Sequence, residues 1–132
     1  MAKFRELKVW QRGMEFTIRA YQASATFPKA ELFGLTSQLR RAATAIPLNI
    51  AEGAGSGSDA EFKRFLRIAQ RSSYEVISAV EIARGLAILA DSVADELARE
   101  AEEIAAMIGG LIRYLSQSGA RRKRSAPAES RD

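Results

Sequence analysis

The apolar residues of this chain recur at every third or fourth position over four long segments. This spacing places them on one face of an α-helix, which turns once in about 3.6 residues. We predict helices over residues 5–26, 34–54, 58–89 and 92–117. On the first helix, the face expected to pack in the core consists of Leu7, Trp10, Met14, Ile18 and Tyr21.

The ends of these helices are predicted from residues that stop or cap a helix. Pro28 ends the first helix, and the glycines of segment 53–57 end the second. Ser58 and Glu61 have the spacing of a capping box, which starts the third helix. The boundary at residues 91–92 rests only on side chains that favour helix caps.

Four amphipathic helices with short links most simply form an all-α, antiparallel, up-down-up-down four-helix bundle. We expect this bundle to be a single domain over residues 1–118. Residues 119–132 have no apolar face, and we predict that they form a disordered basic tail.

A proline inside the second helix is expected to kink it. Pro47 has no amide proton to donate to the carbonyl oxygen of Ala43. Asn49 and Glu52 follow within two turns and are candidates to cap that carbonyl or to hold Arg40 or Arg41. Together with Gly53, where the loop begins, Pro47, Asn49 and Glu52 are interpreted as a structural motif.

Composition removes most enzyme classes. The chain has 132 residues with no histidine and no cysteine, which excludes most zinc sites, thiol nucleophiles and serine–histidine triads. The acid-rich segment 91–103 does not suit a di-iron centre in a bundle, because such centres use Glu-x-x-His pairs. We predict no catalytic residue, metal ligand, cofactor or small-molecule substrate.

Charge is distributed unevenly along the chain. The net charge of +4 combines +6 over residues 1–71, −5 over residues 72–118 and +3 over residues 119–132. Such blocks can pair within one chain, pair between copies in a ring, or leave the basic half free for an anionic polymer. Composition does not choose among these possibilities.

Basic side chains form the candidate nucleic-acid-binding site. The candidates on the helices and the tail are Arg40, Arg41, Lys63, Arg64, Arg67, Arg71, Arg121, Arg122, Lys123 and Arg124. Rows of arginine can bind phosphates without reading bases. The alternative for the helical residues is pairing with Glu52, Glu61, Glu75 or a neighbouring subunit, and for the tail a solubilising role.

Two aromatic residues on the first helix have two interpretations. Trp10 and Tyr21 could stack on bases, but aromatic residues in an apolar stripe more often belong to the core or to a subunit interface, which we favour. No uncharged run is long enough to span a bilayer, and the N-terminal residues lack the apolar core of a secretory signal. We therefore expect a cytoplasmic protein.

Five stretches of sequence carry a family resemblance. They are FRELKVWQ at 4–11, FPK at 27–29, ELFGLTSQLRRAA at 31–43, IPLNIAEG at 46–53 and EFKRFLRIA at 61–69. In order and spacing they resemble the four-helix-bundle family encoded in intervening sequences of bacterial 23S ribosomal RNA genes. This resemblance implies a left-handed bundle, a homopentamer, and kinship with the nucleic-acid-binding accessory protein of diversity-generating retroelements.

The sequence thus supports two hypotheses of different kinds. The first is a non-enzymatic homo-oligomer whose basic surface binds structured RNA or a ribonucleoprotein partner. The second is a structural or protein-interaction scaffold whose charged faces are used in ring assembly. The family has no settled molecular function, so the resemblance does not decide between them.

Overall fold

The computed structural model describes residues 3–124 of the chain, and the side chains of residues 3–119. Within these residues the protein is all-α, with four long helices and no strand. They are α1 (Lys8–Ser24), α2 (Leu35–Ala54), α3 (Asp59–Gly85) and α4 (Asp91–Arg124). Short 3-10 turns precede α1 at Lys3–Glu6 and α2 at Lys29–Glu31.

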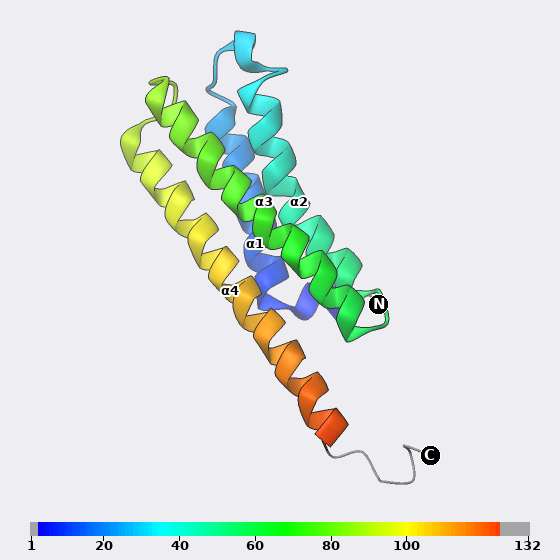
Figure 1. Ribbon diagram of the computed structural model, residues 1–132. Helices are drawn as coiled ribbons and strands as arrows, with labels where there is room; N and C mark the ends of the chain where they lie inside the picture. The colour runs from blue at the N-terminus through cyan, green and yellow to red at the C-terminus, as the bar shows by residue number, and fades with distance from the viewer. Residues whose placement is uncertain (1–2, 125–132) are drawn as a thin grey trace.

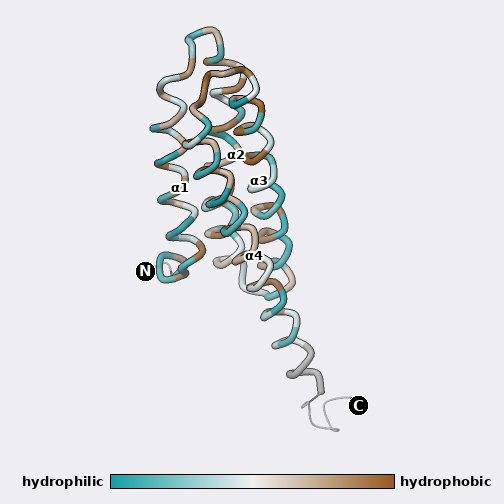
Figure 2. The backbone as a smooth tube through the Cα atoms, turned by 90° about the vertical axis from the view of Figure 1, so that its left-hand side faces the viewer, coloured by the Kyte–Doolittle hydropathy of each residue, from teal (hydrophilic) through white to brown (hydrophobic). Residues whose placement is uncertain are grey.

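Consecutive helices pack side by side, and α1 also touches α4 (Figure 1). The α1–α2 and α3–α4 connections lie at one end of the molecule, and the α2–α3 connection lies at the other. The C-terminal part of α4 continues past the ends of the other helices, as both ribbon and tube views show (Figures 1 and 2). None of the described helices is long and apolar enough to cross a membrane.

The core follows the expected stripes of α2, α3 and α4. Hydrophobic and hydrophilic positions alternate along each helix (Figure 2). The fully buried large side chains on these three helices are Leu39, Ile46, Ile50, Leu66, Val76, Val80, Ile104 and Ile108. Burying each aliphatic side chain of this size contributes about 1.5–3 kcal/mol, so these residues hold the bundle together.

The predicted core face of α1 is wrong for three of its five residues, because only Leu7 and Trp10 pack against the core, partly buried. Met14, Ile18 and Tyr21 are 36%, 51% and 44% exposed. The buried residues of α1 are instead Val9, Gly13, Phe16, Ala20 and Ser24. Three of these are small, so they add little to an apolar pattern, although they let α2 approach closely. Helix α1 therefore has two apolar faces, and the chain buries the one with smaller side chains.

Helix α3 ends at Gly85, before the predicted end at residue 89. Ala87 adopts a left-handed conformation with φ 58°. The amide of Ala87 donates to Arg84 O at 2.9 Å, and that of Ile88 donates to Ala83 O at 3.1 Å. This is the Schellman pattern that commonly ends helices. The sequence signal is weak because alanine occupies the position where glycine is usual, at a cost of about 1–2 kcal/mol.

Helix α4 is longer than predicted. It runs to Arg124, so the expectation of disorder from residue 119 is wrong for residues 119–124. Ala120 and the four basic residues after it are strong helix formers, and basic residues favour the C-terminal end of a helix dipole. Residues 125–132 of the predicted tail lie outside the described residues.

The carbonyl left free by Pro47 is bound from a neighbouring helix. The hydroxyl of Thr17 in α1 lies 3.1 Å from Ala43 O and 2.8 Å from Gly13 O, and shares its proton between them. A Cβ atom on Gly13 would lie 3.2 Å from Ile46 and 3.5 Å from Pro47. The proline thus fixes a close contact between α1 and α2.

Asn49 and Glu52 do not have the roles that the sequence predicted, whereas Gly53 allows a close contact between two helices. Asn49 donates to Ala45 O at 2.8 Å rather than to Ala43. Glu52 makes no hydrogen bond or ion pair with the described residues, and it does not hold Arg40 or Arg41. A Cβ on Gly53 would lie 2.8 Å from the Cβ of Phe65, so glycine is needed where the end of α2 meets the start of α3.

Candidate nucleic-acid interface

The six basic candidates on α2 and α3 separate into engaged and unengaged side chains. Arg40 is engaged: its guanidinium donates to Ser24 Oγ at 2.8 Å and to Tyr21 O at 3.3 Å, and it lies 4.5 Å from the Tyr21 ring centroid. These contacts join α2 to α1. Arg40 is therefore chiefly a structural residue, and Tyr21 packs on its guanidinium.

Arg64 is also engaged, with the acid that was expected to cap α3. Glu61 O atoms accept from Arg64 at 3.1 and 3.0 Å, and the guanidinium lies 4.4 Å from the Phe65 ring centroid. These bonds lower the pKa of Glu61 and raise that of Arg64. Only half of the predicted capping box forms: Ser58 Oγ accepts from the Glu61 amide at 3.1 Å.

Lys63 makes one long contact. Its Nζ atom lies 3.4 Å from Ser116 Oγ of α4. A neutral partner at that distance leaves the ammonium charge uncompensated, so Lys63 still contributes positive potential near the start of α3.

Arg41, Arg67 and Arg71 are exposed and make no hydrogen bond or ion pair with the residues that the structure describes. Arg67 and Arg71 are four residues apart on α3, so they share its outward face. Arg71 and Gln38 of α2 line the same surface cavity of about 470 Å³, and Arg41 lies three residues after Gln38. Arg41 itself lines a different cavity, of about 770 Å³, together with Tyr21 and Leu48. Arg41 and Arg71 therefore border two cavities rather than one, and we call the outer surface of α2 and α3 that carries the three free arginines the α2–α3 face.

Sequence reasoning missed two residues beside this face. Arg113 of α4 is exposed and has no hydrogen bond or ion pair within the described part of the chain. It was hidden because it lies in the acidic half of the sequence. Tyr74 is 53% exposed and follows Arg71 by three residues, a spacing that could have revealed it.

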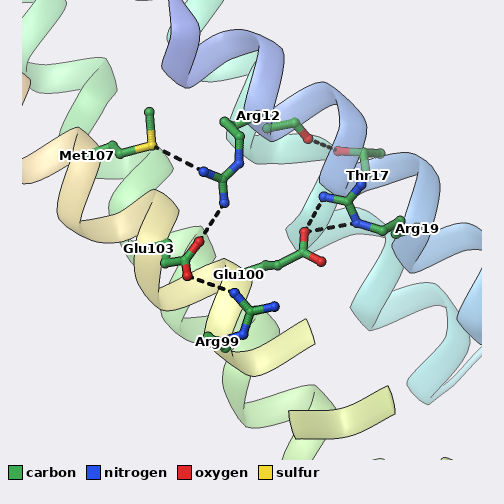
Figure 3. Close-up of polar contacts among 8 residues, drawn as sticks. Arg12, Thr17, Arg19, Arg99, Glu100, Glu103 and Met107 are labelled. Carbon is green, nitrogen blue, oxygen red and sulfur yellow. Dashed lines mark hydrogen bonds and ion pairs between the residues drawn. The ribbon is translucent and has the colours of Figure 1, made fainter. Parts of the chain in front are cut away.

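Most carboxylates of residues 72–118 form ion pairs within the molecule. Figure 3 shows the line of contacts between α1 and α4, which we call the α1–α4 seam. Arg12 NH2 lies 2.8 Å from Glu103 Oε2, and Arg19 Nε donates to Glu100 Oε2 at 2.9 Å. Glu100 is only 6% exposed, whereas the side chain of Arg19 is 38% exposed, so the carboxylate is withdrawn from water and the guanidinium only partly.

Four further ion pairs are made by Arg99 and Arg84. Arg99 binds the other oxygen of Glu103 at 2.8 Å, and the two arginines lower the pKa of Glu103, with Arg12 the larger cause. At the α3–α4 turn, Arg84 contacts Glu81 at 3.1 Å and Asp91 at 3.6 Å, and it also binds Asp95. Arg84 and Arg99 belong to the acidic block themselves, so among the described residues the ion pairs that join the basic block to the acidic block are those of Arg12 and Arg19.

The arrangement on the α2–α3 face suits anion binding. Free guanidiniums offer planar pairs of donors that match phosphate oxygens. Over residues 3–119, no group of three or more acidic side chains is placed to hold a metal ion. Arg121, Arg122, Lys123 and Arg124 occupy the last turn of α4, and their side chains lie outside the described part.

Comparison with known proteins identifies a family for this chain. The curated proteins give no match to this sequence. Residues 5–110 match the family described as 23S rRNA-intervening sequence protein, in agreement with the resemblance noted from the sequence. Because the match covers most of the chain, the protein belongs to the 23S rRNA-intervening sequence protein family.

Proposed function

We propose that this protein is a non-enzymatic, oligomeric bundle that binds structured RNA, free or within a ribonucleoprotein partner, through the α2–α3 face. The observation that carries the proposal is that Arg41, Arg67 and Arg71 are exposed and unpaired within the described chain. The family description refers to 23S rRNA, which is consistent with an RNA partner.

The physical basis is release of counterions from the phosphate backbone. Each arginine that neutralises a phosphate displaces condensed cations, so the binding constant falls steeply with salt. Arg67 favours this role, because the side chains three and four positions away on α3 are Lys63, Arg64, Gln70 and Arg71. None of these is acidic, so their summed field attracts an anionic polymer.

The assembled form is part of the same proposal. We place the four helices in a left-handed, up-down-up-down bundle with a kink at Pro47, and five copies in a cytoplasmic ring. Support for self-association comes from the second apolar face of α1, where Met14, Ile18 and Tyr21 are at least one-third exposed. Exposed apolar faces of this kind commonly form contacts between proteins.

That apolar face also favours the second candidate function, a scaffold without nucleic-acid binding. In a scaffold, the complementary charges of the two halves would be used between copies. Against this, Glu100, Glu103 and Asp95 are already paired within the chain, which leaves fewer acids for the arginines of another copy. The RNA-binding proposal therefore has the stronger support.

The test is a titration of structured RNA over a salt series, with molar mass measured by light scattering in the same buffers. It is run on the full chain and on a chain ending at Ser118, which removes the basic residues after the bundle. Three phosphate contacts on a duplex predict a slope of about −3 in log K against log salt. Binding that survives the truncation supports the α2–α3 face as the site. A stable oligomer that binds no RNA at any salt contradicts the proposal and favours the scaffold.

A further inference from the structure

An exposed aromatic side chain continues the row of arginines on α3. Tyr74 follows Arg67 by seven residues and Arg71 by three, which are spacings of one helix face. The side chain is 53% exposed, and the described residues offer it no hydrogen bond. An apolar ring left in water beside free guanidiniums has the composition of a site for stacking on a base.

Tyr74 also lies between two hollows in the surface. One cavity, of about 470 Å³, has residues of α2 and α3 in its wall and includes Arg71. The other, of about 270 Å³, has residues of α3 and α4 in its wall and includes Arg113. Tyr74 lines both cavities, so its ring has an unpaired arginine on each side.

Carboxylates in the same cavities determine which part of an RNA fits there. Glu75 lines the cavity of Arg71, and Glu102 lines the cavity of Arg113. Each carboxylate repels a phosphate and weakens the attraction for a continuous backbone across Tyr74. Around Arg67 the carboxylate of Glu61 is already bound by Arg64, so it repels a phosphate less. A neutral base over Tyr74 is not repelled by these carboxylates, and the phosphates on either side of the base are still attracted by the arginines.

We propose that Tyr74 stacks on an unpaired base of the bound RNA, and that Arg71 and Arg113 hold the phosphates on either side of that base. This inference rests on the proposed RNA-binding function and narrows its partner to RNA with a loop, a bulge or a single-stranded end. In a continuous A-form duplex the bases are stacked on one another and their faces are not available to a side chain.

The experiment compares two RNAs with equal numbers of phosphates, a hairpin with an unpaired loop and a blunt duplex. Both are titrated against the full-length protein and its Tyr74→Ala and Tyr74→Phe variants. We expect Tyr74→Ala to lower affinity for the hairpin by about 10-fold, a typical loss for one stacked base. It should leave duplex affinity unchanged, and Tyr74→Phe should retain hairpin affinity because the ring remains.

Two further variants separate stacking from indirect effects. Phe33→Ala is the matched control, since Phe33 is an aromatic residue that is 93% exposed but lies in the connection before α2. It should bind both RNAs like the native protein. Arg113→Gln should weaken hairpin binding by several fold and reduce its salt slope by about one unit.

The outcomes distinguish this inference from the function on which it rests. If the native protein binds neither RNA, both fail. If it binds hairpin and duplex alike and Tyr74→Ala changes neither, RNA binding stands and the stacking role is overturned. Equal losses for both RNAs in Tyr74→Ala would also overturn it, because only the hairpin has an unpaired loop base on which Tyr74 can stack. Binding of an acidic helical peptide, but not of RNA, at Tyr74 would assign the site to a protein partner instead.

Discussion

The α1–α4 seam and the α2–α3 face both carry arginines along exposed helices, but only at the seam are these arginines bound by carboxylates of the facing helix. At the seam, Arg12 and Arg19 are bound to Glu103 and Glu100 of the facing helix. On the α2–α3 face, Arg67 and Arg71 face outward without an acid within hydrogen-bond reach among the described residues. The same residue type therefore stabilises the fold in one region and remains available in the other.

This difference shows that net charge over half a chain does not identify a binding surface. A guanidinium already bound to a carboxylate must give up that contact before it can hold a phosphate. A free guanidinium loses only its hydration. The contribution of each arginine to RNA binding should therefore follow its engagement within the fold rather than its place in the basic half of the sequence.

The largest expected effect comes from reversing charge on the α2–α3 face. In the double variant Arg67→Glu and Arg71→Glu, we expect RNA affinity to fall by about 100-fold or more at moderate salt, because two phosphate contacts become repulsive. Thermal stability should change little, since both side chains are exposed and unpaired. RNA titration and thermal denaturation measure the two effects.

The matched control reverses one charge at the seam. Arg12→Glu should retain RNA binding and lower the melting temperature, because it places a carboxylate beside Glu103. If Arg12→Glu abolishes RNA binding in a folded protein, the division between the two regions is wrong.

The next effect concerns the most buried ion pair of the seam. Replacing Arg19 by Ala leaves Glu100, which is 6% exposed, without its partner. Breaking a fully buried pair costs about 3–5 kcal/mol, and the partial exposure of Arg19 reduces this to about 2 kcal/mol. Urea denaturation measures the loss.

Removing the acid as well should recover part of that loss. Arg19→Ala combined with Glu100→Gln leaves no unpaired charge, so it should be more stable than Arg19→Ala alone. Equal stability of the single and double variants would show that water already solvates Glu100.

A smaller loss of stability is expected from removing a neutral hydrogen bond of α1, and it can be distinguished from the loss of an ion pair. Thr17→Val keeps the shape of the side chain and removes the hydroxyl that serves Ala43 O beside Pro47. We expect a loss of about 1 kcal/mol, with no dependence on salt, because no charge is involved. Thr17→Ser retains the hydroxyl and should lose less. If Thr17→Val loses no stability, the hydrogen bond to Ala43 O does not stabilise this contact, whereas a loss in Thr17→Ser measures the contribution of the methyl group.

The helices could be predicted because most of them bury continuous apolar stripes. Leu39, Ile46, Val76 and Ile104 are fully buried where the 3.6-residue period places them. The period failed on α1, where glycine, alanine and serine supply half of the buried face. Burial there depends on how closely α2 can approach, and that is a property of the packed structure rather than of hydrophobicity.

The sequence predicted which residue types form the candidate site, but only in part which of its arginines are bound by other residues of the fold. The sequence places Arg64 and Arg67 in one stripe, and the spacing of three between Glu61 and Arg64 offers a partner to Arg64 that Arg67 lacks. Arg40 is withdrawn by Ser24, a residue 16 positions earlier that only the fold brings near. Arg113 joins the site from another helix, so no local pattern could include it.

The smallest predicted effect is the response of the seam to acid. Arg12 and Arg99 hold the pKa of Glu103 below its ordinary value of 4.5, so the unfolded chain takes up a proton at higher pH than the folded one. The stability that this network contributes is present above pH 4.5 and is lost as the pH falls through the lower pKa of the folded state. Glu103→Gln should therefore lower stability at neutral pH and flatten its dependence on pH in that acidic window.

Glu61 on α3 provides the matched control, because Arg64 lowers its pKa in the same way. Glu61→Gln should give a weaker flattening, since this exposed pair lies within one helix and joins nothing across the bundle. It also releases Arg64 into the row of free arginines, so RNA affinity should rise by a few fold, whereas Glu103→Gln should leave it unchanged. If Glu103→Gln raises RNA affinity as much as Glu61→Gln does, the arginines of the seam are as available to RNA as those of the α2–α3 face, and engagement within the fold does not decide which of them bind.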